Sequence, residues 1–334
     1  MSGGARSAGI IGCTLLCATL LGVLAAFPLC ALASASLATA AADLQSGKAD
    51  EAASLLTDVL RSEPQNAEAN NLLCRVEYTL EEFDEAASHC EKAVSLDSQN
   101  ARYHLWLGRA LGERASRASF MSAFSLAKRT RQEFETAVKL NPKDADALSD
   151  LCQFYEEAPG AVGGGVDKAE DIASKLDVVD AALGHQAHGE IAEKKKDLAA
   201  AEQDFKSAIQ GAAHPAFQWM ALASFYRRHE RWQEMEAAVN SGSAAAARDR
   251  HAAVALFNGA SILARTDRQT DLAIKMLTGY LASPDKTEEA PAFEAMIKLA
   301  KLYKKSGDLA AAERQRQAAL AIAHNYRPAQ DPKL

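Results

Sequence analysis

The chain has 334 residues, 48% of them hydrophobic and 24% charged, a composition that excludes wholesale disorder. With 37 basic and 44 acidic residues the formal charge is −7, which argues against a general nucleic-acid binder, because such a protein needs a basic surface. Alanine is abundant and aromatic residues make up only 6%, so the composition favours helices over a large β-sandwich.

The N-terminal segment has the organisation of a secretory signal. Arg6 is the only charged residue in it, and the stretch from Ile10 to Phe27 is apolar. Pro28 interrupts that stretch, and Ala31–Ala33 then offers the small residues that a signal peptidase requires. We therefore predict a signal peptide over residues 1–33.

Two alternatives remain for residues 1–33. An apolar run of this length can just span a bilayer, so the segment can also act as an uncleaved membrane anchor. The residues around Cys13 resemble a lipidation site, although little hydrophobic sequence precedes them. Each interpretation exports the rest of the chain, so we expect a periplasmic protein, or one anchored to the inner membrane.

The exported part repeats itself. Asp50–Ala52 reads Asp-Glu-Ala and recurs 34 residues later at Asp84–Ala86. A related pattern, an aspartate-leucine pair followed by a small alanine, occurs at Asp197–Ala201 and at Asp308–Ala312. Fixed self-similarity at this period is the signature of a repeat architecture, in which stacked units share one core.

These motifs resemble the tetratricopeptide repeat family, whose 34-residue units are helix–turn–helix pairs. The resemblance covers roughly residues 36–325 and implies an all-α, right-handed superhelical solenoid of about eight units, with residues 34–326 in the solenoid and 327–334 as a disordered tail. The expected units start near Leu37, Ala67, Ala101, Ala145, Ala182, Ala216, Ala252 and Pro291.

The resemblance also implies a concave groove lined by the first helix of each unit. Carried over unit by unit, the groove positions that we expect to bind a partner are Asn71, Arg75, Tyr78, Arg102, Arg109, Gln153, Glu156, Arg227, Arg228 and Lys301. Arg75 and Arg109 occupy matching places on successive first helices and should lie outside the core. The alternative is that both pair with nearby carboxylates such as Glu68 and Glu113.

Two units depart from the repeat. The third is about ten residues too long, and residues 111–131 either lengthen both of its helices or form a protruding partner site with Phe120, Met121 and Phe124. In the fourth, Ala158–Gly165 extends the turn with a glycine run. We expect a simple loop there, with an anion site at its amides as the alternative.

Three cysteines lie in the exported part, and no C-x-x-C spacing supports a zinc site. Cys74 and Cys152 fall where the family places small core residues, so we expect buried thiols, with a Cys74–Cys90 bridge as the alternative. His185, His188 and Glu190 lie close together on one helix, but they lack the H-E-x-x-H pattern and an obvious third ligand for zinc. We therefore interpret them as solvated helix residues.

The sequence thus predicts a non-catalytic scaffold of the cell envelope, with no cofactor and no metal, that binds a protein or peptide in its concave groove. We expect no nucleic-acid partner, and membrane contact only through the N-terminal segment if it is uncleaved. The alternative is a small-molecule-binding or transport-associated protein, whose pocket would lie at the insertions over residues 111–131 and 158–166.

Overall fold

The computed structural model describes the backbone of residues 21–334 and the side chains of residues 33–334. The predicted signal or anchor over residues 1–33 lies almost entirely outside the side chains that are described. Among the helices of the described part, none is both long and apolar enough to cross a bilayer.

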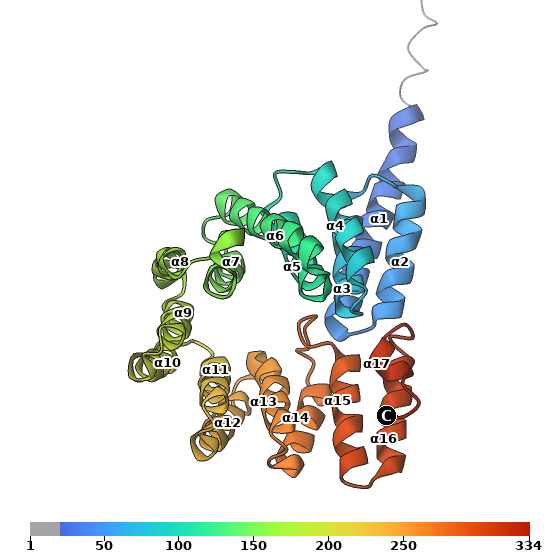
Figure 1. Ribbon diagram of the computed structural model, residues 1–334. Helices are drawn as coiled ribbons and strands as arrows, with labels where there is room; N and C mark the ends of the chain where they lie inside the picture. The colour runs from blue at the N-terminus through green and yellow to red at the C-terminus, as the bar shows by residue number, and fades with distance from the viewer. Residues whose placement is uncertain (1–20) are drawn as a thin grey trace, which may run out of the picture.

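The described residues form eight consecutive antiparallel helix pairs, and α17 follows them (Figure 1). The first helices of the pairs are α1 (Leu21–Ser46), α3 (Ala67–Thr79), α5 (Ala101–Arg117), α7 (Ala145–Glu157), α9 (Ala181–Lys194), α11 (Pro215–Arg228), α13 (Ala253–Arg265) and α15 (Ala292–Lys305). The second helices are α2 (Ala49–Ser62), α4 (Phe83–Leu96), α6 (Phe120–Leu140), α8 (Val166–Val179), α10 (Leu198–Gly211), α12 (Trp232–Ala246), α14 (Thr270–Ala282) and α16 (Leu309–Leu320). The expected all-α solenoid of eight units is confirmed.

Small residues allow the two helices of each pair to approach closely. Ala52, Ala86, Ala201 and Ala312 on the second helices are all buried, as the repeat pattern predicts. On the first helix of the third unit, a Cβ at Gly108 would lie 2.5 Å from the ring of Phe134, so this crossing accepts only glycine.

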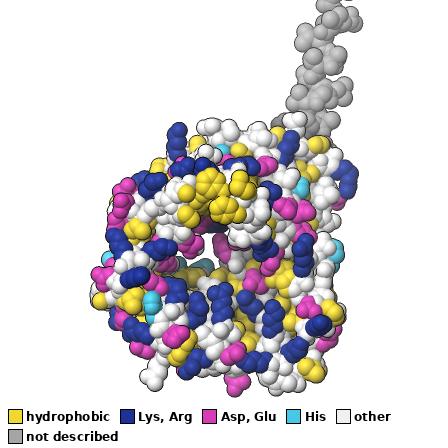
Figure 2. Space-filling model, viewed as in Figure 1, with side chains coloured by type: hydrophobic (Ala, Val, Ile, Leu, Met, Phe, Trp, Pro, Cys, Tyr) yellow, Lys and Arg dark blue, Asp and Glu magenta, His cyan; other side chains and the backbone are white. Residues whose placement is uncertain are grey.

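The third unit has two lengthened helices, which confirms the first of the two interpretations of residues 111–131. α5 has 17 residues and α6 has 21, whereas most other helices have 13 or 14. Phe120 and Met121 at the start of α6 are nevertheless 84% and 79% exposed. A patch of hydrophobic side chains lies over this hairpin, above a hollow in the molecule (Figure 2).

The solenoid closes on itself, which the sequence does not predict. α1, α2 and α3 meet α15, α16 and α17, so that the first helices of the solenoid contact the last ones (Figure 1). One buried cluster contains Leu44 and Leu72 from the N-terminal end together with Phe293, Ile297 and Tyr326 from the C-terminal end. The molecule is therefore a ring of helix pairs.

Polar contacts reinforce this closure. His324 Nδ1 lies 2.7 Å from Asp50 Oδ1, and the backbone N–H of Asp50 donates to the carbonyl of Ile322 over 3.1 Å. Gly47 has a φ of +81°, and a Cβ there would lie 2.7 Å from the backbone nitrogen of Ala292. Glycine is thus required both by the turn and by the contact between the two ends.

The C-terminal residues correct the expectation of a disordered tail. α17 (Arg327–Gln330) is a short helix in which Ala329 is fully buried. Arg316 donates to the carbonyl of Ala329 over 3.1 Å, and Tyr326 packs against Phe293 with ring centroids 4.8 Å apart. The tail is ordered because it forms part of the ring-closing interface.

Candidate functional site

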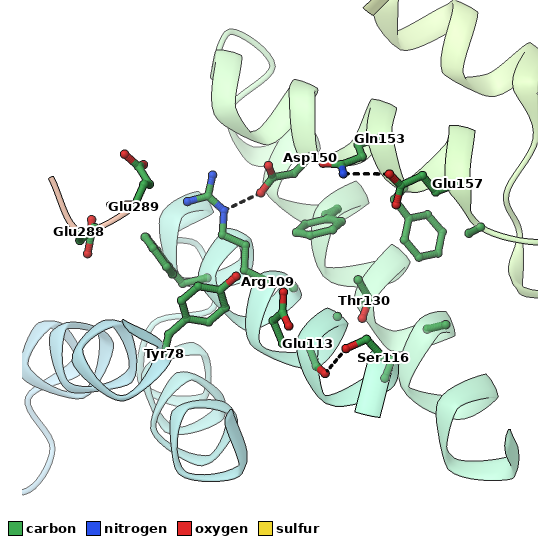
Figure 3. Close-up of a pocket in the computed structure, with 18 residues that line it drawn as sticks. Tyr78, Arg109, Glu113, Ser116, Thr130, Asp150, Gln153, Glu157, Glu288 and Glu289 are labelled. Carbon is green, nitrogen blue, oxygen red and sulfur yellow. Dashed lines mark hydrogen bonds and ion pairs between the residues drawn. The ribbon is translucent and has the colours of Figure 1, made fainter. Parts of the chain in front are cut away.

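A pocket of about 620 Å³ opens on the inner face of the ring. Its walls come from the first helices α3, α5 and α7, from α6, and from the segment between α14 and α15 (Figure 3). Its polar lining residues are Tyr78, Arg109, Glu113, Ser116, Thr130, Asp150, Gln153, Glu157, Glu288 and Glu289, and its aromatic ones also include Trp106, Phe134 and Phe154.

The lengthened third unit builds one side of this pocket. Gly112 and Ser116 lie on the extension of α5, and Ala127 and Thr130 lie on the facing part of α6. A helix pair of ordinary length would leave this side open. The insertion therefore has a role in the site even though its exposed Phe120 does not line it.

Carboxylates dominate the charge of the pocket. Glu113, Asp150, Glu157, Glu288 and Glu289 line it, against a single cationic lining residue, Arg109. Arg109 donates from Nε to Asp150 Oδ2 over 2.6 Å, and its guanidinium lies 4.7 Å from the centroid of the Trp106 ring. In Figure 3 the Arg109 side chain lies between Asp150 and the acidic segment that carries Glu288.

The titration behaviour of the pocket follows from burial and from this negative charge. Burial raises the pKa of Asp150, although Arg109 opposes the shift. Burial, and then the charge of Glu113, raise the pKa of Tyr78 to about 12. In both groups burial is the largest cause of the shift, because it disfavours the charged form.

Three of the residues expected to bind a partner line this pocket: Tyr78, Arg109 and Gln153. Arg109 pairs with a carboxylate, as the alternative interpretation expected, but the partner is Asp150 and not Glu113. Gln153 donates from Nε2 to Glu157 Oε1 over 3.1 Å.

Arg75 corrects the sequence interpretation. It was expected outside the core, but its side chain is 2% exposed and pairs with Glu288 rather than Glu68. Arg75 Nε donates to Glu288 Oε2 over 2.8 Å, across the closed ring. Asn71, one turn earlier on α3, is fully buried as well, so neither residue can meet a partner on an open groove.

The other expected residues lie apart from the pocket lining. Arg102 and Lys301 are exposed, and Glu156 is half-buried. Arg228 pairs with Glu193 over 2.6 Å, while Nε of Arg227 is buried and has no hydrogen-bond partner among the described residues. Lys and Arg side chains gather over α11, α13 and α15, below the hollow, so this wall of the ring is basic (Figure 2).

Sequence reasoning missed Trp106, Asp150, Glu288 and Glu289 as site residues. Asp150 lies on a first helix one turn before Gln153, so helical spacing could have found it. Glu288 and Glu289 lie between two helices, far along the chain from the rest of the pocket. No local pattern points to them, because only ring closure brings them there.

The glycine segment forms a folded loop rather than an open cradle. The N–H groups of Gly163, Gly164 and Gly165 donate to the carbonyls of Gly160, Pro159 and Tyr155 over 2.9, 3.2 and 2.8 Å. These amides are already satisfied within the loop. The anion-site alternative therefore lacks free donors at these positions.

The cysteines and histidines also have structural partners. Cys74 and Cys90 form a disulfide between α3 and α4, so the bridged alternative holds for this pair, and Cys152 is a buried free thiol. His185 and His188 contact Asp204 and Asp177 rather than a common point. The described residues contain no cluster of His, Cys, Asp and Glu suited to a metal ion.

Comparison with known proteins identifies the repeat. Residues 43–109 match the family model described as tetratricopeptide repeat, a segment that runs from the end of α1 to the middle of α5. No curated protein matches the chain.

Solved structures similar to the chain include two described as tetratricopeptide repeat proteins, and PilF. One from Thermus thermophilus is 19% identical, with 58% of this chain and 98% of that chain covered and a TM-score of 0.49. One from Parabacteroides merdae is 12% identical, with 90% and 99% covered and a TM-score of 0.46. PilF of Pseudomonas aeruginosa is 18% identical, with 64% and 91% covered and a TM-score of 0.48.

The family match and the observed helix pairs agree. The matched segment contains the second unit, in which the crossing alanine and the buried positions follow the repeat pattern. Residues 43–109 thus match the tetratricopeptide repeat model, and the helix pairs that follow them have the same helix–turn–helix arrangement.

Proposed function

We propose that this protein is an exported, non-catalytic scaffold of the cell envelope that binds a segment of a partner protein on the inner face of the ring. The observation that carries the proposal is the pocket of about 620 Å³ on that face. Three successive first helices line it, which is the face that repeat proteins of this kind offer to partners.

Two observations support export. The N-terminal segment has the order of a secretory signal. The bridge between Cys74 and Cys90 is fully buried between two helices, and disulfides persist in oxidising compartments such as the bacterial periplasm.

Site-specific photo-cross-linking tests the binding proposal. A photoreactive amino acid replaces Ser116, which is exposed and lines the pocket, in the full chain expressed in its own envelope. The matched control carries the same group at Ser95, an exposed serine on the second helix α4. We expect a discrete cross-linked protein from position 116 alone. Equal products from both positions, or none from position 116, would contradict the proposal.

Export is tested at the cleavage site. Replacing Ala31 and Ala33 with bulky charged residues should block processing and leave a heavier, membrane-bound chain, because signal peptidase requires small residues there. Fractionation and mass determination measure the result. An unchanged mass and an unchanged distribution of the protein between membrane and soluble fractions would contradict the cleaved-signal interpretation.

A second candidate function is binding of a small molecule, as in a transport-associated protein. The volume of the pocket lies within the range of about 300–1,000 Å³ typical of ligand sites, and aromatic rings of Phe134 and Phe154 line it. Of the two insertions, residues 111–131 contribute several lining residues and 158–166 contribute only Ala158. Native mass spectrometry of the chain purified from the envelope should reveal such a ligand as a fixed added mass. A Ser116→Trp variant should then lose it.

A further inference from the structure

We propose that the pocket receives a single cationic side chain, arginine or lysine, from the partner segment. This inference rests on the proposed function, and it adds the chemistry of the ligand. It is argued from the unbalanced charge of the pocket, from its aromatic walls and from the way the chain already holds one guanidinium there.

The first argument is the charge balance. Of the five carboxylates that line the pocket, Asp150 pairs with Arg109 and Glu288 pairs with Arg75. Glu113, Glu157 and Glu289 have no ion pair within the part of the chain that the structure describes. Three carboxylates thus line a cavity whose one cationic residue, Arg109, is already paired with Asp150, and an entering cation would offset their mutual repulsion.

The second argument is that the pocket already contains a guanidinium. Arg109 lies over Trp106 and donates to Asp150, which combines stacking on an aromatic ring with a charge-assisted hydrogen bond. The guanidinium of Arg75 lies 5.3 Å from the centroid of the same Trp106 ring, and Arg75 pairs with Glu288. The same two kinds of contact are available to an incoming side chain at Phe154 and Glu157.

The third argument concerns the shape of the incoming residue. Phe134, Phe154 and Ala127 line the pocket beside its carboxylates. The methylene stem of arginine or lysine packs on apolar surface while its charged end reaches a carboxylate. A short anionic side chain would bury itself against Glu113 and Glu157 instead, which costs free energy.

The basic wall below the hollow restricts the charge that a partner segment can carry. Lys and Arg side chains gather over α11, α13 and α15, and they would repel a long basic run (Figure 2). The segment that fits both walls carries one cation for the pocket and has neutral or acidic residues on the side toward α15.

Ring closure completes the site. Glu288 and Glu289 belong to the segment before α15, and the buried pair between Glu288 and Arg75 holds that segment against α3. The acidic pocket therefore combines units two to four with the end of the seventh. An open solenoid would lose two of the five carboxylates.

The test uses pools of heptapeptides with random flanking residues and one fixed central residue: arginine, citrulline, or glutamate. Citrulline keeps the shape of arginine and removes its charge. The immobilised full chain should retain the arginine pool at least tenfold better than the citrulline pool. Glu113→Gln/Glu157→Gln should reduce retention of the arginine pool at least fivefold, toward the citrulline level.

Two controls keep the result interpretable. Glu51→Gln changes an exposed carboxylate on α2, outside the pocket lining, and should leave retention unchanged. Glu157→Gln alone alters an exposed residue, so it should fold even if the double variant does not, and it should show an intermediate loss. Far-ultraviolet circular dichroism checks the helical content of each variant.

The outcomes separate this inference from the proposed function. If Ser116 cross-links a partner while the arginine and citrulline pools are retained equally, the cationic ligand is wrong and partner binding stands. Preference for the glutamate pool would likewise overturn the inference. If neither a cross-link nor retention of any pool occurs, both proposals fail.

Discussion

Arg75 and Arg109 show how two equivalent places in a repeat acquire different roles. They lie 34 residues apart on successive first helices, and their guanidinium groups lie 5.3 and 4.7 Å from the centroid of the same ring, that of Trp106. Arg75 is 2% exposed and pairs with Glu288 across the ring, whereas the side chain of Arg109 is 17% exposed and pairs with Asp150 of the next unit. Arg75 therefore stabilises the closure of the ring, and Arg109 lines its pocket.

The difference teaches that closure, not the repeat, decides what a groove position does. In an open solenoid both arginines would lie on the same inner surface. Here the C-terminal segment covers the surface of α3, so the pair made by Arg75 is desolvated. The pair made by Arg109 stays at the edge of a cavity. The predictions below separate these two environments, in order of expected effect.

The largest effect is expected from removing one partner of the buried pair. Glu288→Ala leaves the guanidinium of Arg75 buried and unpaired, and losses of this kind are about 3–5 kcal/mol. Denaturant unfolding monitored by circular dichroism measures it. Asp150→Ala removes the partner of Arg109 in the more open environment and should cost only about 1 kcal/mol. Equal losses in the two variants would mean that the ring is not closed in solution.

The next effect concerns the disulfide that supports the helix carrying Arg75. Cys74→Ala/Cys90→Ala should lower the free energy of unfolding by about 3 kcal/mol, because the bridge closes a loop of 16 residues in the unfolded chain. Chemical denaturation measures the loss, and reductant should have the same effect on the unaltered chain. Cys152→Ala serves as the control, since this thiol forms no bridge. Free thiols titrated in the denatured, unreduced exported chain should number one, and three would contradict the bridge.

A pH effect of intermediate size is expected from Glu190 on α9. Burial raises the pKa of Glu190 on α9 from its ordinary value of 4.5 to about 7, and Glu156 and Glu193 oppose its ionisation while Arg228 favours it. The native state therefore binds more protons than the unfolded state between these values, so the free energy of unfolding falls as pH rises through that window. The fall should be about 2–3 kcal/mol and should level off above pH 7.

Glu190→Gln tests the assignment. The variant cannot ionise at this position, so its stability should lack most of that fall and exceed the stability of the unaltered chain at pH 8. Unfolding curves at pH 5, 6, 7 and 8 measure the difference. An identical pH profile in the two proteins would show that another group is responsible.

The smallest effect is expected at the exposed start of α6. Phe120→Ser/Met121→Ser should change the free energy of unfolding by no more than about 0.5 kcal/mol, because both side chains are largely exposed. Cross-linking from Ser116 should also continue. Loss of the cross-linked partner without loss of stability would place the partner on this patch and not in the pocket.

Much of the fold could be predicted because it depends on local pattern. Ala86 and Ala312 mark helix crossings through their size alone, and the excess length of residues 111–131 predicts the lengthened third unit. Tyr78 and Gln153 could be expected on the inner face because the resemblance to the repeat family implies groove positions there, and both line the pocket. The bridge between Cys74 and Cys90 could be named only as an alternative, since spacing did not separate it from two buried thiols.

The sequence by itself determined the class of fold and the number of helix pairs, because both depend on contacts between residues one unit apart. Only the tertiary structure decided that the ends meet, that Arg75 is buried and that Glu288 and Glu289 complete the pocket. The pair between Arg75 and Glu288 spans 213 residues of chain. The physical reason is that closure depends on the accumulated rotation of all eight units, and no single repeat encodes that sum.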